Sequence, residues 1–236
     1  MPLRKPVHGI FFDLGWTLLY PVSGNWMFSN FARAYFRQEI LDSLPQERVT
    51  AAMKQAMDHL DQNHQLDTID QEYQQFLTYY TMVAEALPEL GLSQAQLRKV
   101  AEDHVYNLEN VRLYPASLPT LQALAGRYRL GIISDTWPSI LSQLEHLGLS
   151  SFFQCATYSY TLGTYKPDPR MYRDALEKMG LPPEETIFVD DSTGNLRGAA
   201  ALGIQPVLIQ AKPSSSKPDP GMTALSDLEE LPELLG

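Results

Sequence analysis

The chain has 236 residues, of which 18 are Lys or Arg and 28 are Asp or Glu, so its formal net charge is −10. Hydrophobic residues make up 44% and aromatic residues 10%, which excludes a disordered chain and suits a globular protein with a substantial core. The acidic balance and the lack of a basic stripe argue against a nucleic-acid partner, because the phosphate backbone is itself anionic. No apolar run approaches the roughly 18 residues of a transmembrane helix. With a single cysteine, Cys155, and no membrane segment, we expect a cytoplasmic protein.

A strand followed by a helical region opens the chain. Residues 7–12 form an apolar, β-prone run that ends at Asp13. From about residue 25 to 110 we find four stretches with the 3.6-residue spacing of amphipathic helices and no convincing strand. Their apolar faces lie within residues 28–36, 53–60, 69–87 and 97–108, and the pattern Ser93-x-x-Gln96 is a capping box for the last of them. The pattern predicts a four-helix bundle that forms a domain of its own.

After residue 111 helices and strands alternate. Four helical stretches that end in glycine are each followed by a β-prone run, and these runs are residues 130–134, 152–157, 186–190 and 204–209. This alternation predicts a Rossmann-like α/β fold with a parallel sheet and helices on both faces. We therefore place the core domain at residues 1–20 and 111–236, with the helical domain inserted at 21–110. Residues 212–221 are predicted to form an exposed loop, and the stretch from Ser226 a short closing helix.

Polar side chains follow the predicted strands where each strand ends. In open α/β sheets the carboxyl ends of the strands border a crevice where ligands bind. The side chains expected there are Asp13, Ser134, Asp135, Lys166, Asp190, Asp191 and Asn195.

This set of residues favours phosphoryl transfer. Asp13 can act as a carboxylate nucleophile, and Asp13 with Asp191 can hold Mg²⁺ as hard oxygen ligands. Lys166 and Ser134 can stabilise the equatorial phosphoryl oxygens. Taken singly, the residues after Ser134 could be a helix cap and those after Lys166 a turn. A signalling receiver domain is excluded, because its acidic pair comes early in the chain and here the pair comes last.

The motif order resembles the haloacid dehalogenase superfamily of hydrolases, with an all-helical cap inserted after the first strand. The four segments that carry the resemblance are residues 11–18 (FFDLGWTL), 132–134 (IIS), 166–169 (KPDP) and 188–195 (FVDDSTGN) with 199–203 (AAALG). The resemblance implies a Mg²⁺-dependent phosphatase that acts on a small phosphorylated substrate through an aspartyl-phosphate intermediate.

The resemblance also implies roles for individual residues. Asp13, Ser134 and Lys166 would be catalytic, and Asp13, the backbone carbonyl of Gly15 and Asp191 would bind the metal. Substrate contacts are expected from Trp16, Thr17, Ser134, Asp135 and Lys166. Asp190 and Asn195 would support the metal ligands.

Gly15 departs from the phosphatase pattern, which has a general acid/base aspartate at this position. Loss of a positioned acid/base typically costs about 10²–10⁴-fold in rate. The substrate could then have a leaving group that needs little protonation, such as an anomeric or acyl phosphate, or Tyr20 or a polar cap residue could supply the proton. Two alternatives follow from Gly15: a metal-independent, dehalogenase-like C–X hydrolase, and a non-hydrolytic protein that binds a phosphorylated ligand.

For the histidines of the helical region, the sequence favours a structural role over a functional one. His59 and His64 lie on a polar stretch at a spacing that does not place them on one helix face, so we expect a solvated surface there. His104 falls on an apolar stripe and is predicted to pack inside the bundle. Trp16 is expected either at the mouth of the pocket or under the cap.

Overall fold

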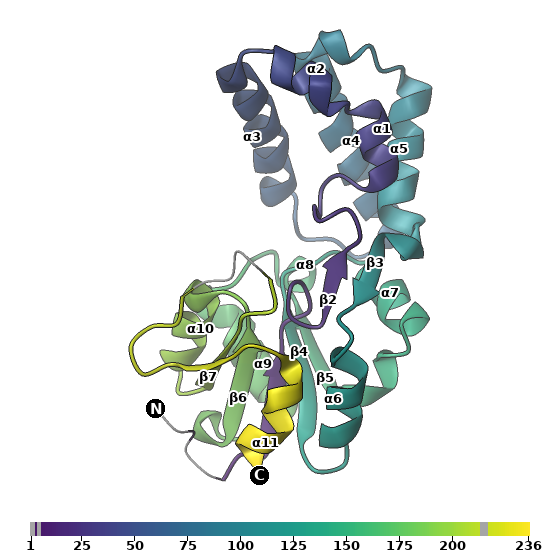
Figure 1. Ribbon diagram of the computed structural model, residues 1–236. Coiled ribbons are helices and arrows are strands. Elements are labelled where there is room, and N and C mark those ends of the chain that lie inside the picture. Colours follow the sequence, from purple (N-terminus) through teal and green to yellow (C-terminus); the bar gives the residue numbers. More distant parts are fainter. Residues whose placement is uncertain (1–2, 4–5, 213–216) are drawn as a thin grey trace. The chain divides into compact units, whose positions relative to one another are not determined.

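The computed structural model describes residues 3, 6–212 and 217–236 (Figure 1). These residues fall into two compact units. The α/β unit comprises residues 1–20, 112–136 and 144–236, and the helical unit comprises residues 21–111 and 137–143. The predicted boundary between residues 110 and 111 lies one residue before the boundary in the structure, which falls between residues 111 and 112. Residues 137–143 were predicted to lie in the α/β core, whereas in the structure they belong to the helical unit.

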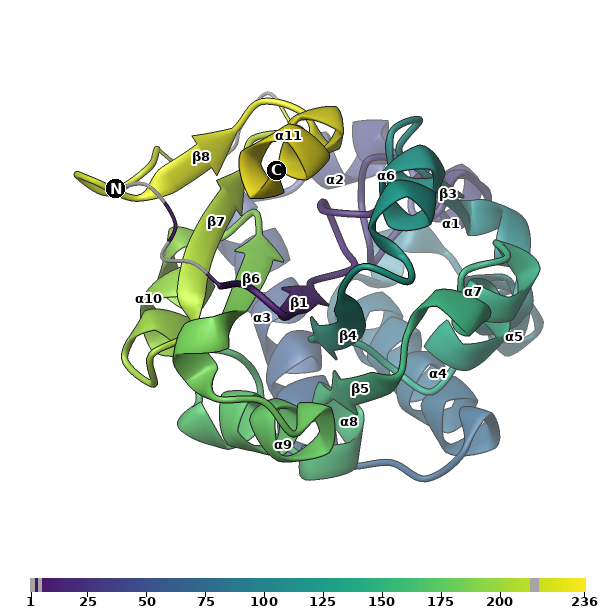
Figure 2. The ribbon, with the colours of Figure 1, turned by 90° about the horizontal axis from the view of Figure 1, so that it is seen from below.

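The α/β unit is built on a six-stranded parallel sheet, in the order β5-β4-β1-β6-β7-β8. Its strands are β1 (Gly9–Phe12), β4 (Arg129–Ser134), β5 (Cys155–Tyr158), β6 (Thr186–Asp190), β7 (Gln205–Ile209) and β8 (Thr223–Leu225). Its helices are α6 (Ser117–Leu124), α8 (Ser159–Leu162), α9 (Pro169–Met179), α10 (Thr193–Ala200) and α11 (Leu231–Leu235), and α7 (Ile140–His146) has residues in both units. Helices α9 and α10 cover one face of the sheet, and α6 and α11 cover the other (Figure 2). The predicted Rossmann-like α/β fold is confirmed.

The sequence located most of these elements within a few residues. Residues 186–190 form β6 as predicted, whereas the run predicted from residue 152 starts as a strand only at Cys155. Residues 150–152 instead form a turn of 3-10 helix. The short strands β2 (Leu19–Pro21) and β3 (Val111–Leu113), which pair with each other, were not predicted, and neither was β8. The predicted 212–221 loop includes residues 213–216, which lie outside the described residues.

The helical unit has five helices within residues 21–111, where the sequence predicted four. They are α1 (Asn30–Tyr35), α2 (Gln38–Ser43), α3 (Gln46–Gln62), α4 (Ile69–Ala86) and α5 (Gln94–Tyr106). Arg37 has an extended backbone and separates α1 from α2, whose six residues are too few to give a clear periodicity. The predicted capping box at Ser93 and Gln96 is present at the start of α5.

Helix α4 is the centre of this unit, because it packs against both α3 and α5. Its buried aromatic side chains include Phe76, Tyr79 and Tyr80. His104 of α5 stacks on Phe76 with ring centroids 3.7 Å apart and pairs with the Tyr80 hydroxyl at 2.9 Å, which confirms its predicted place in the bundle interior. The prediction for His64 was wrong: it is 2% exposed and its ring packs edge-on against Trp137.

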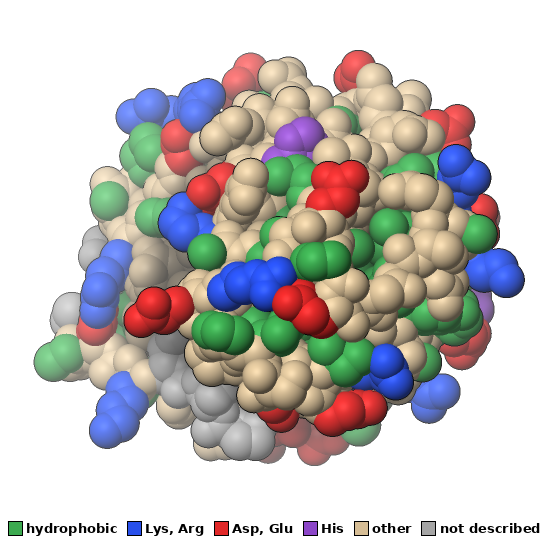
Figure 3. Space-filling view, turned by 90° about the horizontal axis from the view of Figure 1, so that it is seen from above, with side chains coloured by type: hydrophobic (Ala, Val, Ile, Leu, Met, Phe, Trp, Pro, Cys, Tyr) green, Lys and Arg blue, Asp and Glu red, His purple; other side chains and the backbone are tan. Residues whose placement is uncertain are grey.

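One face of the molecule carries charged side chains of both signs. On the face drawn in Figure 3, Lys and Arg side chains lie scattered among Asp and Glu side chains. Among the residues that the structure describes, no helix combines the length and the apolar character needed to cross a membrane.

Candidate active site

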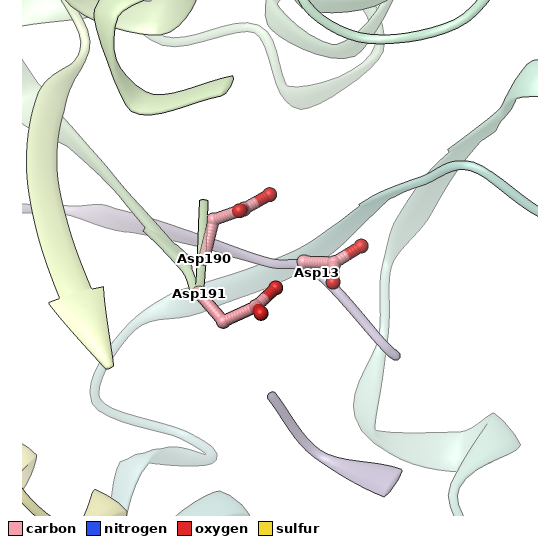
Figure 4. A group of neighbouring side chains, drawn as sticks. All are labelled: Asp13, Asp190 and Asp191. Atoms are coloured by element: carbon pink, nitrogen blue, oxygen red, sulfur yellow. The ribbon is translucent and has the colours of Figure 1, made fainter. Parts of the chain in front are cut away.

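Two adjacent strands, β1 and β6, bring the predicted carboxylates together. Asp13 directly follows β1, and Asp190 and Asp191 stand at the end of β6, which pairs with β1. The Asp13 backbone amide donates to the Val189 carbonyl at 2.9 Å, which joins the two strand ends. One carboxylate oxygen from each of the three aspartates lies within 4.8 Å of the others (Figure 4). Ser134 ends β4, on the other side of β1.

Lys166 connects these strand ends, although it comes from the loop before α9. Its buried Nζ donates to Asp13 Oδ1 at 2.6 Å and to Asp190 Oδ2 at 2.9 Å. A third hydrogen bond, at 3.2 Å, goes to the carbonyl of Ile133 in β4. The backbone amide of Lys166 donates to Asp135 Oδ1 at 2.9 Å, so the predicted substrate residue Asp135 also holds the lysine loop. A buried ammonium with three acceptors is a fixed positive charge.

Asp190 is occupied by partners from its own unit. Besides Lys166, it accepts hydrogen bonds from the Ser192 amide at 2.7 Å and from Asn195 Nδ2 at 3.1 and 3.2 Å. Both of its oxygens are therefore engaged, and it is poorly placed to ligate a cation as well. Asp13 and Asp191 remain as the carboxylates that a cation could share, and Asp190 and Asn195 lie where supporting residues were expected.

The electrostatics of the site favour an additional cation. The pKa of Asp13 is raised to about 7, chiefly by burial; the Lys166 ammonium opposes this rise, and the carboxylates of Asp190 and Asp191 add to it. Burial also raises the pKa of Asp191. Burial alone would lower the pKa of Lys166, but Asp13, Asp190 and Asp135 raise it well above its ordinary value, so this side chain stays charged. Hard oxygen ligands that repel one another in a buried site suit Mg²⁺, which would stabilise their ionised forms.

Two buried hydroxyl groups have no hydrogen-bond partner among the described residues. They are Thr17 Oγ1, in the loop after Asp13, and Ser134 Oγ, at the end of β4. A buried hydroxyl without a partner loses the hydrogen bonds that it makes with water, at a cost of about 1–3 kcal/mol. Both residues were predicted to contact substrate, and oxygen atoms of a bound phosphoryl group would satisfy them.

The loop after Asp13 is tightly closed. The Leu14 carbonyl accepts the amides of Leu18 and Leu19 at 2.9 and 3.0 Å, and the Trp16 amide donates to the Leu19 carbonyl at 2.7 Å. Trp16 has φ = 61°, a left-handed conformation that non-glycine residues rarely adopt. Gly15, the predicted backbone ligand, lies in this loop between Asp13 and Trp16, so the loop fixes where its carbonyl can point.

Sequence reasoning missed two residues next to the site. Lys212, three residues beyond β7, forms an ion pair with Asp191 Oδ2, and its Nζ lies 5.1 Å from the centre of the Trp16 ring. The strand-end rule that found Asp13 and Asp191 would have found Lys212 as well, because β7 is the neighbour of β6. The second is Gly198 of α10, where a Cβ would lie only 2.8 Å from Pro167 Cβ and 2.9 Å from the Tyr172 ring. Its missing side chain lets α10 approach the lysine loop closely.

Known proteins of related sequence include both dehalogenases and phosphatases. The chain is 33% identical over 127 residues to (S)-2-haloacid dehalogenase 1 of Pseudomonas sp. (strain CBS-3), which covers 52% of this chain and 56% of that protein. It is 30% identical over 152 residues to phosphoserine phosphatase of Thermus thermophilus, covering 62% of this chain and 61% of that protein. The chain thus spans less than two thirds of the length of each of these relatives.

The fold and a family model agree with these relatives. A crystal structure of 2-haloacid dehalogenase from Pseudomonas syringae pv. tomato DC3000 superposes with a TM-score of 0.66 over 98% of both chains, at 22% identity, which demonstrates a shared fold. The model of the family described as haloacid dehalogenase-like hydrolase matches residues 36–209, about three quarters of the chain. The chain therefore belongs to the haloacid dehalogenase-like hydrolase family.

Proposed function

We propose that this hydrolase is a Mg²⁺-dependent phosphatase that acts on a small phosphorylated metabolite, with Asp13 as its nucleophile. The observation that supports this most is the pair Asp13 and Asp191, whose carboxylates lie in one group of oxygens within 4.8 Å while Asp190 is occupied by its own hydrogen bonds. Two shared carboxylates on neighbouring strands are a suitable donor set for a hard divalent cation. A dehalogenase would not need such a pair.

In the proposed reaction a carboxylate oxygen of Asp13 attacks phosphorus. The new P–Oδ bond forms as the bond to the leaving oxygen breaks, and water then attacks phosphorus to release inorganic phosphate and restore Asp13. Lys166, which already contacts Asp13 at 2.6 Å, would hold the carboxylate in place and lend its charge to the phosphoryl oxygens. Ser134 and Thr17 would donate their buried hydroxyls to the same oxygens. When bound, Mg²⁺ supplies further positive charge for the transferring group.

The class of substrate that we propose follows from the absence of an acid/base residue at position 15. With Gly15 in place of an acid/base aspartate, the loop offers no carboxyl group to protonate the leaving oxygen. The most suitable substrates are therefore those whose leaving group needs little protonation, such as anomeric or acyl phosphates. A proton from Tyr20 would widen this range.

A second candidate function is hydrolysis of a carbon–halogen bond. It is favoured by Gly15 and by the identity of 33% to (S)-2-haloacid dehalogenase 1. In that reaction Asp13 would attack carbon, the halide would leave with the electron pair of the broken bond, and water would hydrolyse the resulting ester. A halide needs no proton on departure, so the absence of an acid would cost nothing.

Hydrolysis of an aryl phosphate, assayed with Mg²⁺ and with a chelator, tests the proposal. Its leaving group is good, so the missing acid matters least. We expect turnover with Mg²⁺, its loss with the chelator and in Asp13→Asn, and its retention in Asp61→Asn, a control at an exposed position. Halide release from 2-chloropropionate is measured in parallel. Release that persists in the chelator would favour the dehalogenase, and a folded protein inactive on both substrates would favour a non-hydrolytic ligand-binding role.

A further inference from the structure

Lys212 contacts two residues of the candidate site, Asp191 and Trp16. Its Nζ pairs with Asp191 Oδ2, one of the two carboxylates proposed to bind Mg²⁺. The same Nζ lies 5.1 Å from the centre of the Trp16 ring, within the range of a cation–π interaction. The side chain is 23% exposed, so the ammonium is partly withdrawn from water.

Trp16 is held in place to receive this ammonium. Its left-handed backbone, at φ = 61°, is unusual for a residue with a side chain and is kept by the 2.7 Å hydrogen bond from its amide to the Leu19 carbonyl. The loop that carries Asp13 therefore also carries an aromatic platform, and β7 ends three residues before the lysine that rests on it. Trp16 has a strained backbone and is linked to Asp191 through one side chain, that of Lys212. Strained residues cluster at functional sites, which points to a role of Trp16 in this one.

We infer that Lys212 is the resident counter-ion of Asp191, which a divalent cation must displace before Asp13 and Asp191 can share that cation. This inference rests on the proposed metal-dependent function. An ammonium at Asp191 Oδ2 and a divalent cation on the same carboxylate carry like charges, which repel at short range. Lys212 thereby weakens metal binding, and the Trp16 ring keeps the displaced ammonium beside the site.

The size of the effect follows from exposure. Because the pair is partly open to solvent, its interaction is screened, and its loss should change affinity by a small factor. Removing the charge of Lys212 should tighten Mg²⁺ binding about 5-fold. Mg²⁺ would then no longer have to break the partly exposed ion pair between Lys212 and Asp191, and the repulsion between the ammonium and the metal would be gone.

Calorimetric titration of the full chain with Mg²⁺ is the direct test. Lys212→Met and Lys212→Gln are compared with the natural protein and with Lys217→Met, an exposed lysine farther along the same loop. Far-UV circular dichroism establishes that each variant is folded. We expect a dissociation constant about 5-fold lower in both Lys212 variants, no change in Lys217→Met and no binding in Asp191→Asn.

The possible outcomes separate this inference from the proposed function. Equal or weaker binding in the Lys212 variants would overturn the counter-ion role and leave the metal site standing. Absence of Mg²⁺ binding in every variant would overturn the metal-dependent function and this inference with it. Binding seen only after Lys212 is replaced would support the inference in its strongest form.

Tryptophan emission gives a readout independent of affinity. The chain has three tryptophans, Trp16, Trp26 and Trp137. Displacement of the ammonium should change the emission of Trp16 on Mg²⁺ addition, and this change should vanish in Trp16→Phe and in Lys212→Met while persisting in Trp26→Phe. An unaltered emission change in Lys212→Met would show that the metal does not act through the lysine and would overturn the inference.

Discussion

Glu72 of α4 holds Ser139 with both carboxyl oxygens: Oε2 accepts the Ser139 backbone amide at 2.6 Å and Oε1 accepts its hydroxyl at 2.7 Å. Glu72 is 1% exposed, so these bonds form out of contact with water. Ser139 follows Ser134 by only five residues, yet it belongs to the helical unit. The pair therefore explains why residues 137–143, which the sequence placed in the α/β core, join the helices instead.

The first prediction concerns the pH dependence of stability. Burial raises the pKa of Glu72 from 4.5 to about 7, although its hydrogen bonds with Ser139 lower it. Between these two values the folded protein keeps a proton that the unfolded chain releases. The contribution of Glu72 to the free energy of unfolding is thus complete below pH 4.5 and is lost as pH rises toward 7, by up to about 1.4 kcal/mol per pH unit. Glu72→Gln should remove this dependence of the free energy of unfolding on pH.

Urea unfolding at pH 5, 6 and 7 measures the effect of Glu72→Gln. The variant should gain stability relative to the natural protein as pH rises. Glu85→Gln, at an exposed position of the same helix, is the control and should leave the slope unchanged. If the free energy of unfolding depended on pH in the same way in the natural protein and in Glu72→Gln, the prediction would be contradicted.

His104 should act in the opposite direction. Burial lowers its pKa from 6.5 to about 4, so the unfolded chain binds a proton between these values that the folded protein does not. Its contribution is complete above pH 6.5 and is lost as pH falls toward 4. His104→Phe keeps the stacking on Phe76 but loses the hydrogen bond with Tyr80, so it should cost about 1 kcal/mol at pH 7 and less at pH 5. Denaturant unfolding at both pH values tests this, with the exposed His146→Phe as control; a cost that grows in acid would refute it.

The charge balance around Lys166 gives the third prediction. Lys166→Met leaves Asp13 and Asp190 buried without their shared cation, which should destabilise the protein by about 3–5 kcal/mol. The double variant Lys166→Met/Asp190→Asn should recover part of this loss, since one of the repelling carboxylates is gone. A double-mutant cycle measured by urea unfolding checks the coupling. Additive losses would mean that Lys166 and Asp190 do not stabilise each other.

Close packing at Gly198 leads to the fourth prediction. A Cβ there would meet Pro167 at 2.8 Å and Tyr172 at 2.9 Å, so Gly198→Ala should cost about 1–3 kcal/mol and should lower turnover by displacing the loop of Lys166. Gly194→Ala lies in the same helix, where the nearest atom is 3.6 Å away, and should be neutral or slightly stabilising. Thermal unfolding and the aryl phosphate assay compare the two variants; equal behaviour would mean that the approach of α10 is not critical.

Local patterns made much of the fold and the candidate site predictable. Asp13, Ser134, Asp190 and Asp191 lie at the end of a buried strand or directly after it. The sheet therefore places them, and the spacing of apolar residues predicts the sheet. The carboxylates and Lys166 converge as expected because parallel strands present their carboxyl ends at one edge.

What the sequence missed depends on contacts between distant residues. Glu72 and Ser139 are 67 positions apart, and nothing near Ser139 signals a helical partner. His64 sits in a polar stretch, and only the fold places Trp137 against it. Lys212 lies in a loop of turn-forming residues, so its composition suggested exposure, whereas its position after β7 brings it to Asp191.

The last prediction concerns the missing acid. Gly15 is not among the glycines with positive φ, so an aspartate there would meet no left-handed strain. If the proposed phosphatase reaction is limited by leaving-group protonation, the natural protein should hydrolyse aryl phosphates much faster than alkyl phosphates. Gly15→Asp should raise the rate on alkyl phosphates by up to about 10²-fold and change the aryl rate little.

Rates for a series of phosphate esters, plotted against the pKa of the leaving alcohol, test this argument. The slope should be steep for the natural protein and shallow for Gly15→Asp, with Gly15→Asn as the control because an amide has the size of the carboxyl group without its acidity. A shallow slope in the natural protein would mean that another residue already donates the proton. Tyr20, which packs against Tyr114 with ring centroids 4.9 Å apart beside the same loop, would then be the first position to replace with phenylalanine.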